Sequence, residues 1–251
     1  MKKIFVYILA GSLCFSACKK DDDEPTYQEP EDITVQNSYD DQSIEKFLDQ
    51  NYLDAQGNIK PFSSTDASDD DYKKLSELNP VKLPSGVVYI MRDGAQPSPG
   101  KPIGSTDVLR LMVRAQTYVG ANTDGNVAFI SEYDFVNTID VSGSPLTDPM
   151  WYYVKNDILT NASTDDAKQK SYYEIEGFQE ALQHFKAFDN IPNETPYNLQ
   201  GVIIVPSRAA FARDNHYGYN GVSYRNRTFI FNFQVYDSST RTADQEKIKV
   251  K

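Results

Sequence analysis

The sequence predicts an α+β fold, in which one antiparallel sheet packs against a single principal helix. Several stretches show apolar residues in alternation or in short continuous runs, the patterns of half-buried and fully buried strands. The segments between them carry turn signals and loops rich in proline and glycine. Residues 178–185 carry apolar side chains along one face of a predicted helix, and this helix lies between predicted strands in the sequence. Strands connected mainly by loops and hairpins around one helix are typical of the α+β class.

Composition narrows the classes of function. The 251 residues carry a formal net charge of −11, which argues against nucleic acid or an anionic membrane surface as the main partner. Both cysteines, Cys14 and Cys18, precede the predicted domain, so the folded part has no disulfide or thiol chemistry. The two histidines, His184 and His216, cannot complete a typical zinc ligand set and fall in no recognisable Ser/His/Asp pattern. No metal or other cofactor is expected, and hydrolase chemistry is disfavoured.

Residues 1–17 have the pattern of a secretory signal peptide. Residues 1–3 (MKK) are basic, and residues 4–15 form an apolar run too short to cross a hydrocarbon core of about 30 Å. Residues 15–18 (FSAC) resemble the lipobox of bacterial lipoproteins, which implies that Cys18 is lipidated and becomes the first residue of the mature chain. A plain signal peptide with an incidental cysteine is the alternative.

The segment after Cys18 carries a second resemblance. Residues 19–24 (KKDDDE) resemble the acidic export signal that follows the lipidated cysteine in surface lipoproteins of the Bacteroidetes. This resemblance implies an outer-membrane, lipid-anchored protein exposed at the cell surface. The alternative is an anchor that faces the periplasm, in which the same charged residues serve only as a solvated tether. Residues 18–42 are acidic and nearly free of aliphatic side chains, so we predict a flexible tether.

Residues 43–80 are predicted to form a helical N-terminal extension. Its helix spans residues 43–52, because apolar side chains recur at i, i+3, i+4 and i+8: Ile44, Phe47, Leu48 and Tyr52. Oxygens that could cap the first turn of this helix come from Asp40, Asp41 and Ser43.

The predicted sheet begins with residues 86–91, which a loop containing three prolines follows. Residues 107–118 are the longest strand candidate, with apolar side chains at alternate positions. The Asp124-Gly125 pair predicts a turn into a strand at residues 127–130. Beyond that strand the pattern is irregular, although residues 151–154 (WYYV) have the composition of a further strand.

The candidate site is a long aromatic loop near the C-terminus. Residues 201–205 predict a strand buried on both faces, and residues 228–235 predict a half-buried strand with Phe and Val on one face. The connection between them, residues 207–226, is about twenty residues long, and such loops tend to be functional or disordered. Its aromatic content argues against disorder: Phe211, His216, Tyr217, Tyr219 and Tyr224. Residues 239–251 form a polar tail.

Four segments, in this order, resemble the FKBP-type peptidyl-prolyl cis–trans isomerases. Residues 83–89 (LPSGVVY) are similar to the family's opening strand, and residues 174–182 (EIEGFQEAL) to the start of its helix. Residues 205–211 (VPSRAAF) are similar to its active-site loop, and residues 228–235 (TFIFNFQV) to its closing strand. The resemblance implies an FKBP-like domain at residues 81–238, with an antiparallel sheet wrapped around one principal helix.

The resemblance also implies an activity and a site. Prolyl isomerisation breaks no covalent bond, and an apolar pocket that binds the twisted amide better than the planar one lowers a barrier of roughly 18–20 kcal/mol. The resemblance assigns catalytic contacts to an aromatic floor, a backbone N–H that bonds the ligand, and two further phenylalanines: Phe178, Ile175, Phe211 and Phe231. It assigns pocket walls to Val222, Tyr224, Tyr133 and Asp134.

Departures from the family pattern leave other functions open. Phe178 stands where the family has a tryptophan, and Phe211 lacks the hydroxyl of the family's tyrosine. Residues 221–226 lack the family's paired prolines. An isomerase or folding factor would act on proline-containing peptide segments or envelope proteins. A catalytically degenerate module would bind peptides or an envelope protein, and an unrelated adhesin or glycan-binding lipoprotein is a third reading. Ordinary core packing is the alternative role for each aromatic residue.

Overall fold

The computed structural model describes residues 27–248. The predicted signal peptide, the lipidation site Cys18 and residues 18–26 of the predicted tether lie outside the described residues. Three α-helices are present in the described part: α1 (Ile33–Gln50), α2 (Asn156–Thr160) and α3 (Glu176–Leu182). Among these residues, none of the helices is long and apolar enough to cross a membrane.

A seven-stranded sheet organises the molecule, and every neighbouring pair of its strands is antiparallel. Its order is β3-β4-β10-β11-β6-β7, with β8 paired to β6. The strands are β3 (Val81–Lys82), β4 (Val88–Met91), β6 (Val108–Thr123), β7 (Asn126–Asn137), β8 (Leu146–Thr147), β10 (Gly201–Val205) and β11 (Arg227–Ser239). Two small antiparallel pairs flank it: β1 (Asn51–Leu53) with β2 (Ile59–Pro61), and β5 (Lys101–Pro102) with β9 (Lys186–Ala187).

The remaining regular elements are single helical turns. They are η1 (Leu75–Glu77), η2 (Thr138–Ser142), η3 (Asp166–Lys168), η4 (Lys170–Tyr172), η5 (Ser207–Ala209) and η6 (Tyr219–Gly221). The antiparallel sheet, with its few separate helices, confirms the predicted α+β class.

One face of the sheet packs against α3. The alternating side chains of β11 lie in this core as the period-2 pattern predicts, and they meet Phe178, Ala181 and Leu182 of the helix. Gly177 allows the helix to approach closely, because a Cβ atom there would lie 2.6 Å from a methyl carbon of Val205. The antiparallel sheet around one principal helix agrees with the architecture that the FKBP resemblance implies.

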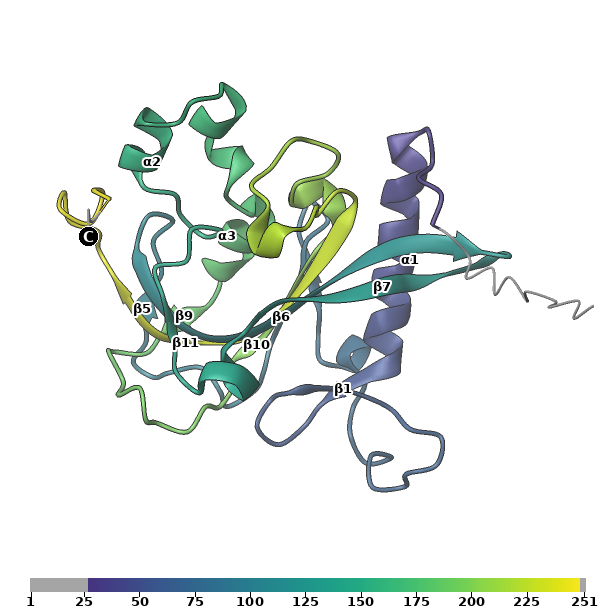
Figure 1. Cartoon of the computed structure of the whole chain (residues 1–251). Coiled ribbons are helices and arrows are strands. Elements are labelled where there is room, and N and C mark those ends of the chain that lie inside the picture. Colours follow the sequence, from purple (N-terminus) through teal and green to yellow (C-terminus); the bar gives the residue numbers. More distant parts are fainter. Residues whose placement is uncertain (1–26, 249–251) are drawn as a thin grey trace, which may run out of the picture.

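The opposite face of the sheet is covered as well. Ile44 and Leu48 of α1 form a second core with apolar residues of the sheet: Val88, Ile90, Val202, Ile204 and Ile230. Figure 1 shows α1, in purple, against the far part of the β6–β7 hairpin, away from α2 and α3. The prediction that β11 is half-buried is therefore wrong, because α1 and the segment after it bury its second face too.

Helix α1 begins ten residues before the predicted start. Its N-cap is Asp32, whose carboxylate accepts the Thr34 N–H at 2.8 Å, and residues 33–42 are helical rather than a flexible tether. The buried stripe repeats every four residues, but its first two members are polar: Gln36, Asp40, Ile44 and Leu48. A search for apolar periodicity finds only the second half of such a helix.

Two further predictions concern turns and strands. Asp124 and Gly125 both adopt positive φ (52° and 85°) and connect β6 to β7, which confirms the predicted hairpin. Residues 151–154 do not form a strand: the N–H groups of Tyr152 and Tyr153 both donate to the Pro149 carbonyl in a turn, and the segment continues as irregular backbone.

Candidate functional site

The fold brings the four predicted catalytic residues into one aromatic cluster. Phe178 of α3 and Phe231 of β11 have ring centroids 4.4 Å apart, and Phe229 links Phe231 to Phe211 of the loop. Ile175 is the N-cap residue of α3. Ile175, Phe178 and Phe231 have no exposed surface, and Phe211 is 2% exposed. The cluster is assembled where the resemblance places a pocket, and its walls are closed to solvent.

Trp151 packs against two of the predicted catalytic residues. Its indole centroid lies 5.1 Å from the ring of Phe178 and 5.3 Å from that of Phe231, and the side chain is 4% exposed. The Ile175 N–H donates to the Trp151 carbonyl at 2.8 Å. The resemblance assigns this N–H to a bound ligand. In this structure the Ile175 N–H is therefore paired within the chain.

Residues 151–154, which we call the Trp151 segment, are fixed on several sides. All four residues are buried. The Tyr152 hydroxyl donates to the Gly104 carbonyl at 2.6 Å, and the Val154 N–H donates to the Glu174 carboxylate at 2.8 Å. Gln179 of α3 donates to the Tyr152 carbonyl and, at 2.9 Å, to Glu174. Burial raises the pKa of Glu174 although these donors oppose the shift. The Trp151 segment is part of the packed core.

Phe135 completes the cluster from the edge strand. The pairing of β7 with β6 shifts between Asp134 and Val136, so Phe135 is an extra residue in a β-bulge. Its ring meets those of Trp151, Tyr224 and Phe229 edge-on, at centroid distances of 5.9, 5.3 and 5.1 Å. Phe135 therefore lies in the core, with 6% of its surface exposed.

Two predicted pocket residues are successive residues of β7 and point to opposite faces of the sheet. Tyr133 is half-buried and packs against the aromatic cluster. Asp134 is exposed and accepts a hydrogen bond at 3.3 Å from Gln116, a residue that lines a groove on the α1 side of the sheet. The structure therefore brings Tyr133 to the cluster and does not bring Asp134 there.

The long loop holds the last two predicted pocket residues. Tyr224 is fully buried, its hydroxyl donates to the Tyr219 carbonyl at 2.9 Å, and burial raises its pKa to about 12. Val222 is half-buried and lies beside a hollow of about 380 Å³ in the outer surface of the loop. Whether the predicted residues contact a substrate stays a prediction.

His216 joins two parts of the long loop. Its Nε2 accepts the Tyr224 N–H at 2.8 Å, which requires an unprotonated Nε2, and its Nδ1 then donates to the Asp214 carbonyl, also at 2.8 Å. The ring stacks on Phe211 with centroids 4.8 Å apart. Within the described part of the chain, no three His, Cys, Asp or Glu side chains are placed to hold a metal ion.

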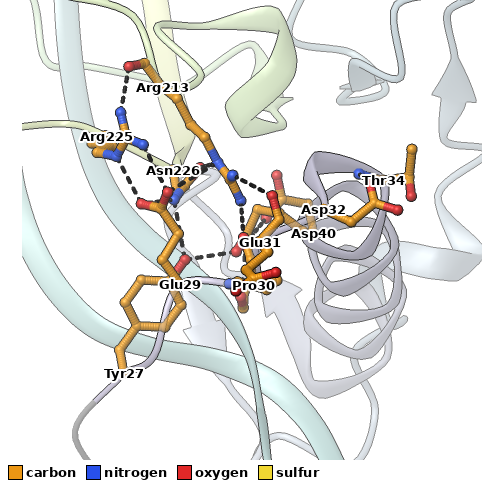
Figure 2. A network of polar contacts seen from close by, with 12 residues as sticks. Tyr27, Glu29, Pro30, Glu31, Asp32, Thr34, Asp40, Arg213, Arg225 and Asn226 are labelled. Carbon is orange, nitrogen blue, oxygen red and sulfur yellow. Dashed lines mark hydrogen bonds and ion pairs between the residues drawn. The ribbon is translucent and has the colours of Figure 1, made fainter.

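Residues 27–31, which precede α1, form hydrogen bonds and an ion pair with the end of the long loop (Figure 2). Arg225 donates two hydrogen bonds of 2.7 Å to the Glu29 carboxylate, and these bonds lower the pKa of Glu29. Arg213 donates to the backbone carbonyls of Pro30 and Glu31 at 2.5 and 3.1 Å. Asn226 donates to the Tyr27 hydroxyl at 3.2 Å. The N-terminal segment thus holds the end of the loop in place.

Asp40 fixes the start of the loop to α1. Its buried carboxylate accepts the Ser207 N–H at 3.0 Å, the Ser207 hydroxyl at 2.5 Å and the Gln36 side-chain amide at 2.9 Å. Burial nevertheless raises the pKa of Asp40. Gly120 of β6 allows α1 to approach the sheet closely at Asp40, because a Cβ atom there would lie 2.9 Å from the Asp40 backbone nitrogen.

The sequence indicated only part of this arrangement. Phe178, Phe211 and Phe231 follow from the resemblance, whereas Trp151 and Phe135 were not selected. The one signal for Trp151 was its position as the single tryptophan of the chain, inside an apolar run. The acidic side chains that hold the loop, Glu29 and Asp40, lie in the region predicted to be a flexible tether.

Solved structures similar to this chain include two FKBP-related ones. FkpA from Escherichia coli is 15% identical with a TM-score of 0.40, and the match covers 82% of this chain and 61% of FkpA. The N-terminal domain of FKBP42 from Arabidopsis thaliana is 12% identical with a TM-score of 0.38, over 73% of this chain and all of that domain. No protein-family model matches the chain, and no curated protein matches it in sequence.

Proposed function

We propose that this chain is a cell-envelope lipoprotein whose FKBP-like domain binds a peptide or protein partner without prolyl-isomerase activity. The observation that carries the proposal is Trp151, which packs against both Phe178 and Phe231 while its carbonyl accepts the Ile175 N–H. An isomerase of this type must admit a prolyl ring and a twisted amide to this place. The chain itself already occupies it.

Opening the cluster is costly. Burial of an aromatic side chain removes 150–250 Å² from water, so withdrawing Trp151 alone costs about 4–6 kcal/mol at about 25 cal/mol per Å². An opening free energy of about 4 kcal/mol lowers the apparent affinity for a ligand about 1,000-fold. Departure of the Trp151 segment also breaks the bonds of Tyr152 and Val154 to Gly104 and Glu174. The closed cluster therefore favours a binding role over catalysis.

The binding and location parts of the proposal have separate support. A groove of about 450 Å³ lies between α1 and the β6–β7 hairpin, within the size range of small-ligand sites. The lipobox-like residues 15–18 and the acidic run after Cys18 support a lipid anchor in the outer membrane with exposure at the cell surface. For a chain anchored there, the proposed partner is an envelope protein. Proline-containing segments would be substrates of this chain only if the aromatic cluster opened.

An isomerase assay tests the catalytic part. With the chain lacking its predicted signal peptide, cis–trans relaxation of an X-Pro tetrapeptide is expected to keep its uncatalysed time of tens of seconds at 25 °C. An active FKBP in the same assay serves as the positive control. Acceleration that rises with the concentration of the wild-type chain, and that a Phe231→Leu variant loses while remaining folded, would contradict the proposal.

A further inference from the structure

A groove on the α1 side of the sheet has the features of a binding site. We call it the α1 groove. Its volume is about 450 Å³, and residues of α1, β1, β2, β6 and β7 line it. The part of the lining on α1 runs from Ser43 to Gln50, and seven helical rises of about 1.5 Å make a length of roughly 10 Å. About three residues of extended peptide have this length.

The α1 groove has an aromatic wall. Phe47 of α1, Tyr118 of β6 and Phe129 of β7 pack against one another with centroid distances of 5.2 to 6.2 Å. All three are half-buried, in contrast to the fully buried rings around Trp151. Burial, with Glu132 nearby, raises the pKa of Tyr118, so its hydroxyl stays neutral. The wall offers apolar surface to an aromatic or aliphatic side chain.

The charges of the groove are opposite in sign to those of the chain. Lys46, Lys60 and Arg114 line it with a single carboxylate, that of Glu132, in a chain of net charge −11. Lys46 donates to the neutral oxygen of Asn126 at 2.8 Å, and Glu132 accepts from Gln116. Arg114 pairs with Asp140, and among residues 27–248 neither lysine forms an ion pair.

Two buried polar atoms of the lining lack a partner. Neither the Ser43 hydroxyl nor the Arg114 Nε forms a hydrogen bond within the described part of the chain. Ser43 is 1% exposed. Buried donors are almost always paired, so an unpaired one calls for a water or a ligand. A carboxylate is the acceptor that best suits a guanidinium N–H.

We propose that the α1 groove binds a short peptide segment in which an aromatic side chain lies beside an acidic one. This inference rests on the proposed function and names its site and the chemistry of its partner. The aromatic side chain packs on Phe47, Tyr118 and Phe129. The carboxylate is held by Lys60 and Arg114. The length of the groove favours a peptide over a compact organic acid.

Matched peptides test the chemistry. The ¹⁵N-labelled chain, without its predicted signal peptide, is titrated with acetyl-Ala-Phe-Glu-Ala-amide, with the same peptide carrying Gln for Glu, and with phenylacetate. We expect saturable shifts of amide signals from residues 43–51, 114–118 and 128–132. The acidic peptide should bind about tenfold more tightly than the Gln peptide, the value of one charge-assisted hydrogen bond of about 1.5 kcal/mol.

Two variants test the residues. Lys60 is exposed and its side chain has no hydrogen bond within residues 27–248, so Lys60→Gln leaves the fold intact and should weaken binding of the acidic peptide about threefold. The control Lys168→Gln, at a remote ion pair with Asp165, should leave binding unchanged.

Several outcomes would overturn the inference. They are the absence of shifts with both peptides, equal affinity for the Glu and Gln peptides, binding that Lys60→Gln does not weaken, and phenylacetate binding as tightly as the acidic peptide. The isomerase assay on the same sample separates the two proposals: a silent assay without peptide binding removes only the groove, whereas acceleration removes the proposed function itself.

Discussion

Replacement of Phe178 by alanine is expected to lower the free energy of unfolding by about 3–5 kcal/mol. Phe178 has no exposed surface and its ring contacts those of Trp151, Phe231 and Phe233. Removing it leaves a cavity between α3 and the sheet that rigid neighbours cannot fill. Urea denaturation followed by far-ultraviolet circular dichroism measures the change.

The control for this variant is Val141→Ala. Val141 is 81% exposed, so the substitution should change the unfolding free energy by less than about 0.5 kcal/mol. A loss below about 1 kcal/mol for Phe178→Ala would mean that this ring lines an open pocket instead of filling a core.

The second large effect is expected at Asp40. Asp40→Ala removes the acceptor of the Ser207 N–H and the Ser207 hydroxyl, which are then unpaired, and one of the two acceptors of the Gln36 amide. We expect a loss of about 3 kcal/mol in unfolding free energy, since one unpaired buried donor costs about 1–3 kcal/mol. Faster hydrogen exchange at the Ser207 amide would show that the loop has separated from α1.

The pH dependence of this site has a definite sign. Burial raises the pKa of Asp40, so the folded chain binds this proton more tightly than the unfolded chain does. The stabilising contribution is complete below the unfolded pKa of about 3.9 and is lost as the pH rises through the higher folded pKa. Asp40→Asn cannot titrate, so its stability relative to the wild type should improve as the pH rises through that window.

An exposed aspartate provides the comparison for this pH series. Asp70→Asn, measured at the same pH values by urea denaturation, should show no comparable improvement, because Asp70 is exposed and its side chain forms no hydrogen bond within the described residues. A wild-type chain that gains stability over Asp40→Asn with rising pH would contradict the assignment.

Local patterns predicted the elements whose burial follows a simple period. The continuous apolar run Gly201–Val205 is β10, the alternating phenylalanines lie in β11, and the Asp124-Gly125 pair forms a hairpin turn. Helix α1 was found only in part, because Gln36 and Asp40 occupy buried positions through hydrogen bonds rather than apolar contacts. A hydrophobicity pattern carries no sign of such pairing.

The sequence also predicted only part of the candidate site. Phe178 and Phe231 meet because a helix and a strand of correct period face each other. Trp151 covers these two rings because the irregular Trp151 segment packs beside them, and no periodicity in the sequence predicts the position of that segment. Tyr133 joins the cluster and Asp134 does not, because successive residues of a strand point to opposite faces, and Phe135 is an extra residue in a bulge that the sequence pattern does not predict. Both features are tertiary.

Trp151 permits the most direct test of the closed cluster, since it is the single tryptophan of the chain. Its side chain is 4% exposed and packs against both Phe178 and Phe231. We predict that the folded chain shows the blue-shifted emission of a buried indole and that acrylamide quenches it far more slowly than in the urea-unfolded chain. Emission and quenching equal to those of the unfolded chain would show that Trp151 is outside the cluster and that the pocket is open.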